Sequence, residues 1–188
     1  MIVLGDPPEA WEALGFRVED GIVALGEERL QLTGRGGGIL EVTAPGLTAD
    51  HPDHLPLRAA EGPRAAEPLR AAEGAGQDPS PHPNGAFAVD HVVVLTGSLD
   101  RTVAALQDVG LDLRRRDERM AFLRLGPYIL EVVERGDDPA RFWGLVVVVD
   151  DPGAVPGAGP ARNAVQPGRR IATVKGLGTA LAVMSRRV

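Results

Sequence analysis

Apolar and polar positions alternate most regularly after residue 87. Four stretches there combine β-branched and aromatic residues with the two-residue period of a half-buried strand: DHVVVLT (90–96), LDLRRR (111–116), RMAFLRLG (119–126) and YILEVVE (128–134). After the first of them, SLDRTVAALQDVG (98–110) places apolar residues at helical spacing, behind a serine or aspartate N-cap and before a terminal glycine. The pattern predicts the order strand, helix, strand, strand, strand.

The same order returns in the last quarter of the chain with its helix shortened. FWGLVVVVDD (142–151) is predicted to form a valine-rich strand, and the glycine- and proline-rich PGAVPGAGP that follows predicts a loop. Three short strands are expected after this loop, in NAVQ, RRIATVKG and TALAVMS. Residues 88–188 are therefore predicted to form one domain of two βαβββ modules, the second of which lacks its helix.

The first 47 residues show a compressed form of this pattern. MIVLGD predicts a short strand, PPEAWEALG predicts a brief helix with proline in its first turn, and FRVEDG, IVALGEERLQLTG and GGILEVTAPG predict the other strands. We therefore expect residues 1–47 to be an abbreviated N-terminal βαβββ-like module. It is expected to add strands to the main domain or to a second copy of the chain.

Between these parts, residues 48–87 are predicted to be a low-complexity linker. The unit Arg-Ala-Ala-Glu occurs three times, at 58–61, 64–67 and 70–73, and proline and polar residues follow it. Prolines interrupt any continuous helix, and the repeated unit has no bulky apolar face to bury. His51 and His54 in this segment are able to chelate a metal, but two histidines beside a proline in a flexible loop are expected to be solvated.

Composition narrows the function classes. The chain has 188 residues, 44% of them apolar, which is typical of a globular protein. A net charge of −6 argues against nucleic-acid binding, and neutral or cationic small molecules fit better. The absence of cysteine excludes disulfides and zinc–thiolate sites. No apolar run approaches the roughly 18 residues of a membrane span, so a soluble, cytoplasmic protein with no membrane partner is expected.

One glutamate interrupts each of two similar apolar strands. Glu41 lies in GGILEVTAPG and Glu131 in PYILEVVERG, although a charge is the least favourable group on a half-buried strand. If both segments close a βαβββ unit, repetition accounts for the doubled glutamate without any catalytic role.

Several of these segments resemble one known superfamily. The strand DHVVV, the helix LDRTVAAL with its terminal glycine, the closing strand ILEVV and the second start FWGLVVVVDD are similar to the vicinal oxygen chelate superfamily of glyoxalase, bleomycin-resistance and extradiol-dioxygenase proteins. The resemblance covers about residues 88–188. It implies an α+β fold of repeated βαβββ modules whose curved sheets enclose a cleft. It also implies divalent-metal ligands on the first and fourth strands of each module.

Only half of that metal site is found in the sequence. By the resemblance, His91 matches the first-strand ligand and Glu131 the ligand of the closing strand, and strand alternation places both on the face expected to line the cleft. In the second module the corresponding position is Leu145, and the closing strand ALAVMS has no ligand. A third ligand is sought in Glu41, in Gln166 or in another subunit. The expected site is incomplete, with weak or absent metal binding.

His91 and Glu131 also allow a purely structural interpretation. His91 is equally well understood as a partly buried histidine bonded to a neighbouring strand, and Glu131 as a carboxylate paired with Arg124 on the preceding strand. Gln166 and an arginine of the pair 169–170 complete the expected ligand-binding set. The two arginines lie on opposite faces of a strand, and we assign Arg170 to the cleft.

Two functions from different classes follow. The first is capture of a small molecule in an apolar cleft with a few polar groups and no certain cofactor. The alternative is a metal-dependent lyase, isomerase or dioxygenase of the glyoxalase type, in which a divalent ion polarises oxygens and Glu131 moves a proton as the catalytic residue. A purely structural copy of the fold is the third option. Exposed strand edges favour a homodimer.

Overall fold

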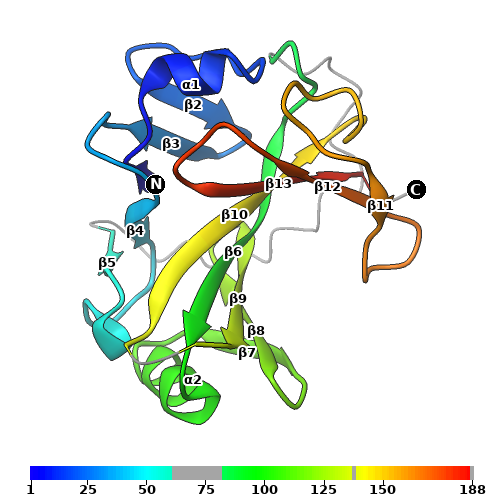
Figure 1. The fold of residues 1–188 in the computed structure, drawn as a ribbon. Coiled ribbons are helices and arrows are strands. Elements are labelled where there is room, and N and C mark those ends of the chain that lie inside the picture. Colours follow the sequence, from blue (N-terminus) through cyan, green and yellow to red (C-terminus); the bar gives the residue numbers. More distant parts are fainter. Residues whose placement is uncertain (61–81, 137–138, 187–188) are drawn as a thin grey trace.

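Two β-sheets make up the computed structural model, which describes residues 1–60, 82–136 and 139–186. Sheet A has five strands in the order β2-β3-β1-β4-β5, and sheet B has eight in the order β11-β12-β13-β10-β6-β9-β8-β7 (Figure 1). The strands of sheet A are β1 (Ile2–Leu4), β2 (Ile22–Leu25), β3 (Glu28–Leu32), β4 (Ile39–Ala44) and β5 (Leu57–Ala59). Those of sheet B are β6 (Ala88–Thr96), β7 (Asp112–Arg116), β8 (Met120–Leu125), β9 (Tyr128–Glu134), β10 (Arg141–Val149), β11 (Arg162–Asn163), β12 (Arg170–Val174) and β13 (Ala180–Ser185).

The first module of sheet B has the predicted order β6-α2-β7-β8-β9. Helix α2 (Leu99–Asp108) begins after Ser98, whose hydroxyl accepts a hydrogen bond from the Arg101 backbone, and Gly110 follows it with a φ of 97°. Strands β6 and β9 are parallel neighbours, so the chain must cross over between them. Helix α2 buries its apolar face against the sheet during this crossover.

The second module repeats this pairing without the helix. Strands β10 and β13 are parallel, as β6 and β9 are, and a loop takes the place of the helix. Because β10 also pairs antiparallel with β6, the two modules form one continuous sheet. The α+β class with repeated strand–crossover–strand modules is thus confirmed.

Sheet A departs from the expected module in its pairing. Its elements up to β4 follow the order strand, helix, three strands, with α1 (Pro8–Glu12) as the helix, and β5 comes after them. However, β1 is parallel to β3 and antiparallel to β4. The expected strand in FRVEDG is wrong: the segment leads into a tight turn in which Asp20 has a φ of 51°. The expectation that these residues extend the main sheet is also wrong, because they form a sheet of their own.

The predicted linker is narrower than 48–87. Helix η1 (Pro52–His54) and strand β5 lie inside that range, and β5 pairs with β4. Residues 82–87 are also packed, since His82, Asn84 and Ala86 are buried. The Arg-Ala-Ala-Glu units at 64–67 and 70–73 lie outside the described residues.

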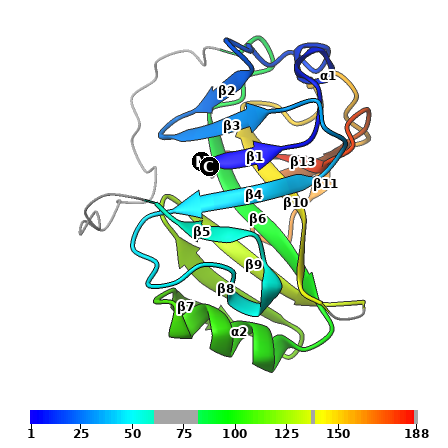
Figure 2. The same cartoon turned by 90° about the vertical axis from the view of Figure 1, so that its left-hand side faces the viewer.

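One core joins the two sheets. Sheet A and α2 lie over the same face of sheet B, as the two perpendicular views show (Figures 1 and 2). Alternate residues of sheet B enter this core, among them Val92, Leu130 and Leu145. The opposite face of sheet B, called the outer face below, carries the residues between them. Within the described ranges, no helix is long and apolar enough to cross a membrane.

Candidate functional site

Four charged side chains form a continuous chain on the outer face of sheet B. An Nη1 atom of Arg169 lies 2.6 Å from Asp90 Oδ1, and Asp90 Oδ2 lies 2.8 Å from His91 Nδ1. His91 Nε2 in turn lies 3.1 Å from Glu131 Oε2. All four are largely buried, with side chains between 8% and 17% exposed. We call these residues the polar cluster.

Strand pairing brings His91 and Glu131 together, as the alternation of the two strands predicts. In the parallel pair β6/β9, His91 is opposite Ile129 and Glu131 is opposite Val93. The two side chains therefore lie on one face as diagonal neighbours, within reach of each other.

A β-bulge adds Asp90 to this face. The register between β6 and β10 shifts at this point, so that Val146 pairs with His91 and Val147 with Val89. Asp90 is the extra residue of the bulge, and a bulge re-aims side chains that strict alternation would send to opposite faces. Its carboxylate can consequently bond the imidazole of the next residue.

Arg169 reaches the cluster from the turn before β12. Its Nε donates to the Ser185 carbonyl at 2.8 Å, and its Nη1 donates to Gln166 Oε1 at 2.6 Å as well as to Asp90. One buried guanidinium thus connects the last two strands of the second module to the first strand of the first module. A planar guanidinium with several donors suits this bridging position.

The cluster is strongly coupled electrostatically. Burial alone would lower the pKa of His91, but hydrogen bonds and the negative charges of Asp90 and Glu131 raise it to about 9. Burial would raise the pKa of Asp90, yet the hydrogen bonds and positive charges of His91 and Arg169 hold it below its usual value. At neutral pH the His91 imidazole is therefore protonated, with a carboxyl group beside each of its ring nitrogens.

Of the other predicted ligand-binding residues, some lie beside the polar cluster and others do not. Gln166 lies beside Arg169, whereas Arg170 points away and donates to the Ala161 carbonyl at 3.1 Å. The assignment of Arg170 to the cleft is corrected to Arg169, because Arg170 shares its strand parity with the core residues Ala172 and Val174. Arg124 is half-buried on the outer face of β8, and the ion pair found for Glu131 among the described residues is with His91.

Glu41 does not belong to this site. It lies on β4 of sheet A, where its carboxylate is 2.6 Å from Nε of Arg58. The sequence matched Leu145 of the second module to His91, and this assignment also needs correction. Leu145 points into the core, and the residue paired with His91 across β6 and β10 on the outer face is Val146. The second module nonetheless presents aliphatic side chains there, Val146 on β10 and Ala182 on β13.

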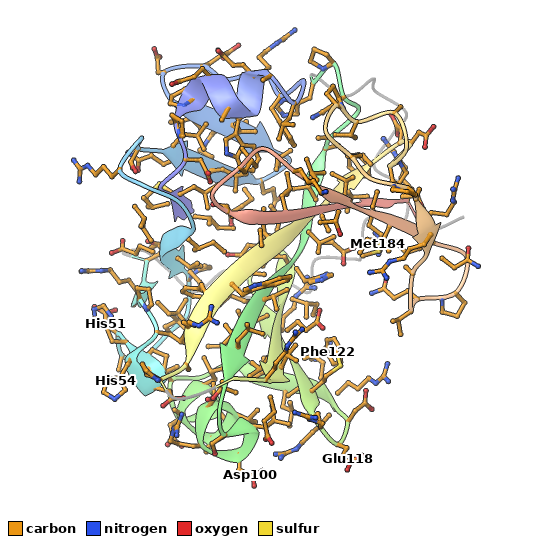
Figure 3. All side chains as sticks on the ribbon, viewed as in Figure 1. His51, His54, Asp100, Glu118, Phe122 and Met184 are labelled. Carbon is orange, nitrogen blue, oxygen red and sulfur yellow. The ribbon has the colours of Figure 1, made fainter. Side chains whose placement is uncertain are left out.

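The donor groups of this face do not fit a divalent metal. Both ring nitrogens of His91 contact carboxylate oxygens, whereas a metal-binding imidazole must offer a free lone pair. No group of three His, Asp or Glu side chains in the described ranges is arranged to hold a metal ion. His51 and His54 are exposed and lie at the edge of the molecule, far from the strand that carries Met184 (Figure 3).

A groove of about 420 Å³ lies next to the polar cluster over the second module. Its floor comes from β6, β10 and β13, and one wall is the segment 175–179 between β12 and β13. The lining residues are Val93, Trp143, Leu145, Val146, Thr173, Val174, Lys175, Gly176, Leu177, Gly178, Thr179, Ala180, Leu181 and Ala182. Trp143 is half-exposed, whereas the second tryptophan, Trp11, is fully buried. An aromatic platform is thus open to solvent beside an aliphatic floor.

Close backbone contact explains the shape of this floor. A Cβ atom on Gly144 would lie 2.2 Å from the Ala180 carbonyl oxygen, so only glycine allows β10 and β13 to approach here. Trp143 does not pack in the core, although it lies in a strand of mostly buried residues. The register shift between Phe142 and Gly144 turns Trp143 outward while Phe142 remains buried.

Asp90 and Arg169 are the members of the cluster that sequence reasoning did not select. Asp90 could have been found from its position, because it is an acidic residue directly before the matched histidine at the start of a strand. Arg169 could have been found only by deciding which of two consecutive arginines faces the cleft, and the sequence does not decide this.

The parallel pairing of first and last strands in both modules, and the side-by-side joining of these modules, identify the fold. The chain has a vicinal oxygen chelate fold. No protein-family model matches the sequence, and no curated protein sequence matches it. Several solved structures are similar to this chain.

One similar structure is methylmalonyl-CoA epimerase from Mycobacterium tuberculosis, with a TM-score of 0.46 and 17% identity over 55% of this chain and 90% of that one. Another is glyoxalase I from Zea mays, with a TM-score of 0.39 and 14% identity over 53% of this chain and 43% of that one. A hypothetical protein from Bacillus halodurans has a TM-score of 0.41 and 11% identity over 53% of this chain and 94% of that one. A shared fold does not fix a function, which depends on the residues of the site.

Proposed function

We propose that this chain binds a small molecule without a metal, with the apolar body of the ligand in the groove and its polar end toward the polar cluster. One observation carries the proposal. Val93 and Val146 line the groove, and they are the strand partners of Glu131 and His91. An aliphatic surface and a pair of oriented polar groups therefore adjoin, as in a typical ligand site.

The dimensions and lining support a ligand of modest size. Small-molecule sites commonly enclose about 300–1,000 Å³, and the groove lies in this range. Lys175 is the charged residue among the groove's lining residues, and the chain has no other lysine. The half-exposed ring of Trp143 offers a stacking surface for an aromatic or planar ligand.

The test uses a fluorescent probe of apolar sites, 1-anilinonaphthalene-8-sulfonate. We expect the wild type to bind it saturably and Ala182→Phe, which fills the groove floor, to weaken binding on the order of tenfold. Trp143 is expected to transfer excitation energy to the bound probe, so Trp143→Phe should remove most of this transfer. Titrations at constant temperature give both quantities.

Ala154→Phe is the matched control, because Ala154 is exposed in the loop after β10 and outside the groove. It should bind the probe as the wild type does. Equal binding by Ala182→Phe and the wild type, or no saturable binding at all, would contradict the proposed site.

The metal-dependent alternative makes a separate prediction. A ligand that binds only the folded state at 100 times its Kd stabilises it by about 2.7 kcal/mol. Because His91 is held by two carboxylates, we expect Zn²⁺, Mn²⁺ or Ni²⁺ to leave the thermal midpoint unchanged, and a chelator to have no effect. One tightly held divalent ion per chain, absent in both His91→Ala and Glu131→Gln, would reverse this conclusion in favour of a lyase, isomerase or dioxygenase.

A further inference from the structure

A buried carboxylate contacts one wall of the groove from residues 1–59, which build sheet A and are called the N-terminal unit below. Asp6 follows β1 and is only 1% exposed. Its Oδ1 accepts hydrogen bonds from the backbone amides of Gly178 at 2.6 Å and Thr179 at 3.1 Å. Its Oδ2 accepts a hydrogen bond from the Thr179 hydroxyl. Three donors of the groove wall thus converge on one side chain that is 172 residues away in sequence from Gly178.

The backbones of the two parts are also in direct contact at this point. A Cβ atom on Gly37 would lie 2.6 Å from the Gly178 Cα, and one on Gly178 would lie 2.5 Å from the Gly37 Cα. The neighbouring amide of Gly38 donates to the Thr179 hydroxyl oxygen at 3.1 Å. The wall therefore rests on two segments of the N-terminal unit, those at Asp6 and at 37–38.

The wall segment 175–179 has few features of its own that would fix its conformation. Segment 175–179 contains two glycines, and Gly176 has a φ of 107°, a conformation that L-residues rarely adopt. It is not part of a strand, and it lies between the paired strands β12 and β13. Charge-assisted hydrogen bonds to a carboxylate are among the stronger contacts that can order such a segment.

We propose that Asp6 is a positioning residue for the groove: it holds segment 175–179 in the conformation that forms the groove wall. This inference rests on the proposed function, since it assigns the N-terminal unit a part in the same ligand site. It accounts for a separate five-stranded sheet that places a fully buried carboxylate against a loop of the second module. Asp6, near the N-terminus, and the polar cluster, from the two modules of sheet B, then both act on the groove.

The experiment compares the Kd of 1-anilinonaphthalene-8-sulfonate among full-length variants, each measured well below its own thermal midpoint. Asp6→Ala should raise the Kd on the order of tenfold. Asp6→Asn keeps an amide oxygen for the two backbone donors and should stay within about twofold. Glu41→Gln is the matched control, because Glu41 is a carboxylate of the same sheet that pairs with Arg58 and does not touch the groove.

A purely structural role for Asp6 would lower the thermal midpoint and leave the Kd of the folded protein unchanged. That result would overturn the inference while the proposed function stood. Absence of binding by the wild type, or unchanged binding by Ala182→Phe, would instead overturn the proposed function. If Asp6→Ala does not fold, Thr179→Val decides, since it removes the hydroxyl donor from the groove side and should weaken binding as well.

Discussion

Arg169→Met is expected to lower the free energy of unfolding by about 3 kcal/mol at pH 7. The guanidinium is buried, and its loss removes a charge partner of Asp90 as well as the donors to Ser185 and Gln166. A buried carboxylate that loses one of its two cationic partners, and a carbonyl left without a donor, both cost free energy. Urea denaturation followed by far-UV circular dichroism measures the difference.

Arg170→Met is the natural control for this substitution. It changes the same residue type one position along the chain, but Arg170 is exposed, and its guanidinium donates to the Ala161 carbonyl. Its effect should stay within about 0.5 kcal/mol. Equal effects of the two substitutions would show that the bridge between the modules contributes no specific stability.

Stability is expected to fall as the pH rises from 6.5 to above 9. The pKa of His91 is about 9 in the folded chain against 6.5 in the unfolded chain, so the folded state binds the proton more tightly. This contribution is complete below pH 6.5 and is lost as the pH rises through 9. Its size is about 3 kcal/mol, at 1.36 kcal/mol for each pKa unit. Urea denaturation at a series of pH values measures it.

The charged groups around His91 affect how stability depends on pH below the range in which His91 titrates. Glu131 and Asp90 contact its ring, and Arg169 contacts Asp90. Because the pKa of Asp90 is lowered in the folded state, its contribution is present above its ordinary value of 3.8 and is lost as the pH falls below it. The decline between pH 6.5 and 9 therefore belongs to His91.

His91→Gln supplies the comparison for the pH experiment. Glutamine has no proton to lose in this range, so the variant should be less stable at pH 6 and show little change in stability up to pH 9. A wild type with flat stability over this interval, or a variant with an unchanged slope, would mean that the imidazole is not held in its protonated form.

Local patterns were sufficient for most of the domain at 88–188. The helix has an N-cap serine and a terminal glycine, and the strands of the first module alternate cleanly, so their positions follow from residues close in sequence. The meeting of His91 and Glu131 follows in the same way once the module is assumed, since strand parity decides which side chains share a face. The proximity was therefore predictable, whereas its chemistry was not.

Two deviations from strict alternation separate the observed site from the predicted one. The bulge at Asp90 brings a second carboxylate to His91, and the register shift at Phe142 turns Trp143 outward. A bulge depends on how two strands pair, and no residue of one strand alone reveals it. The choice between Arg169 and Arg170 depended likewise on which side of β12 faces the core, because Ile171 and Ala172 are both apolar.

The sequence by itself determined the order of helices and strands in residues 88–188, the repetition of the module there and the shared face of His91 and Glu131, because these depend on periodicity and capping among near neighbours. The tertiary structure alone decided that residues 1–59 build a separate sheet and that Asp6 contacts Gly178 and Thr179. It also decided that β6, β10, β13 and the segment 175–179 enclose a groove. These features rest on contacts between residues far apart in the chain, which become specific only when the core packs the two sheets together.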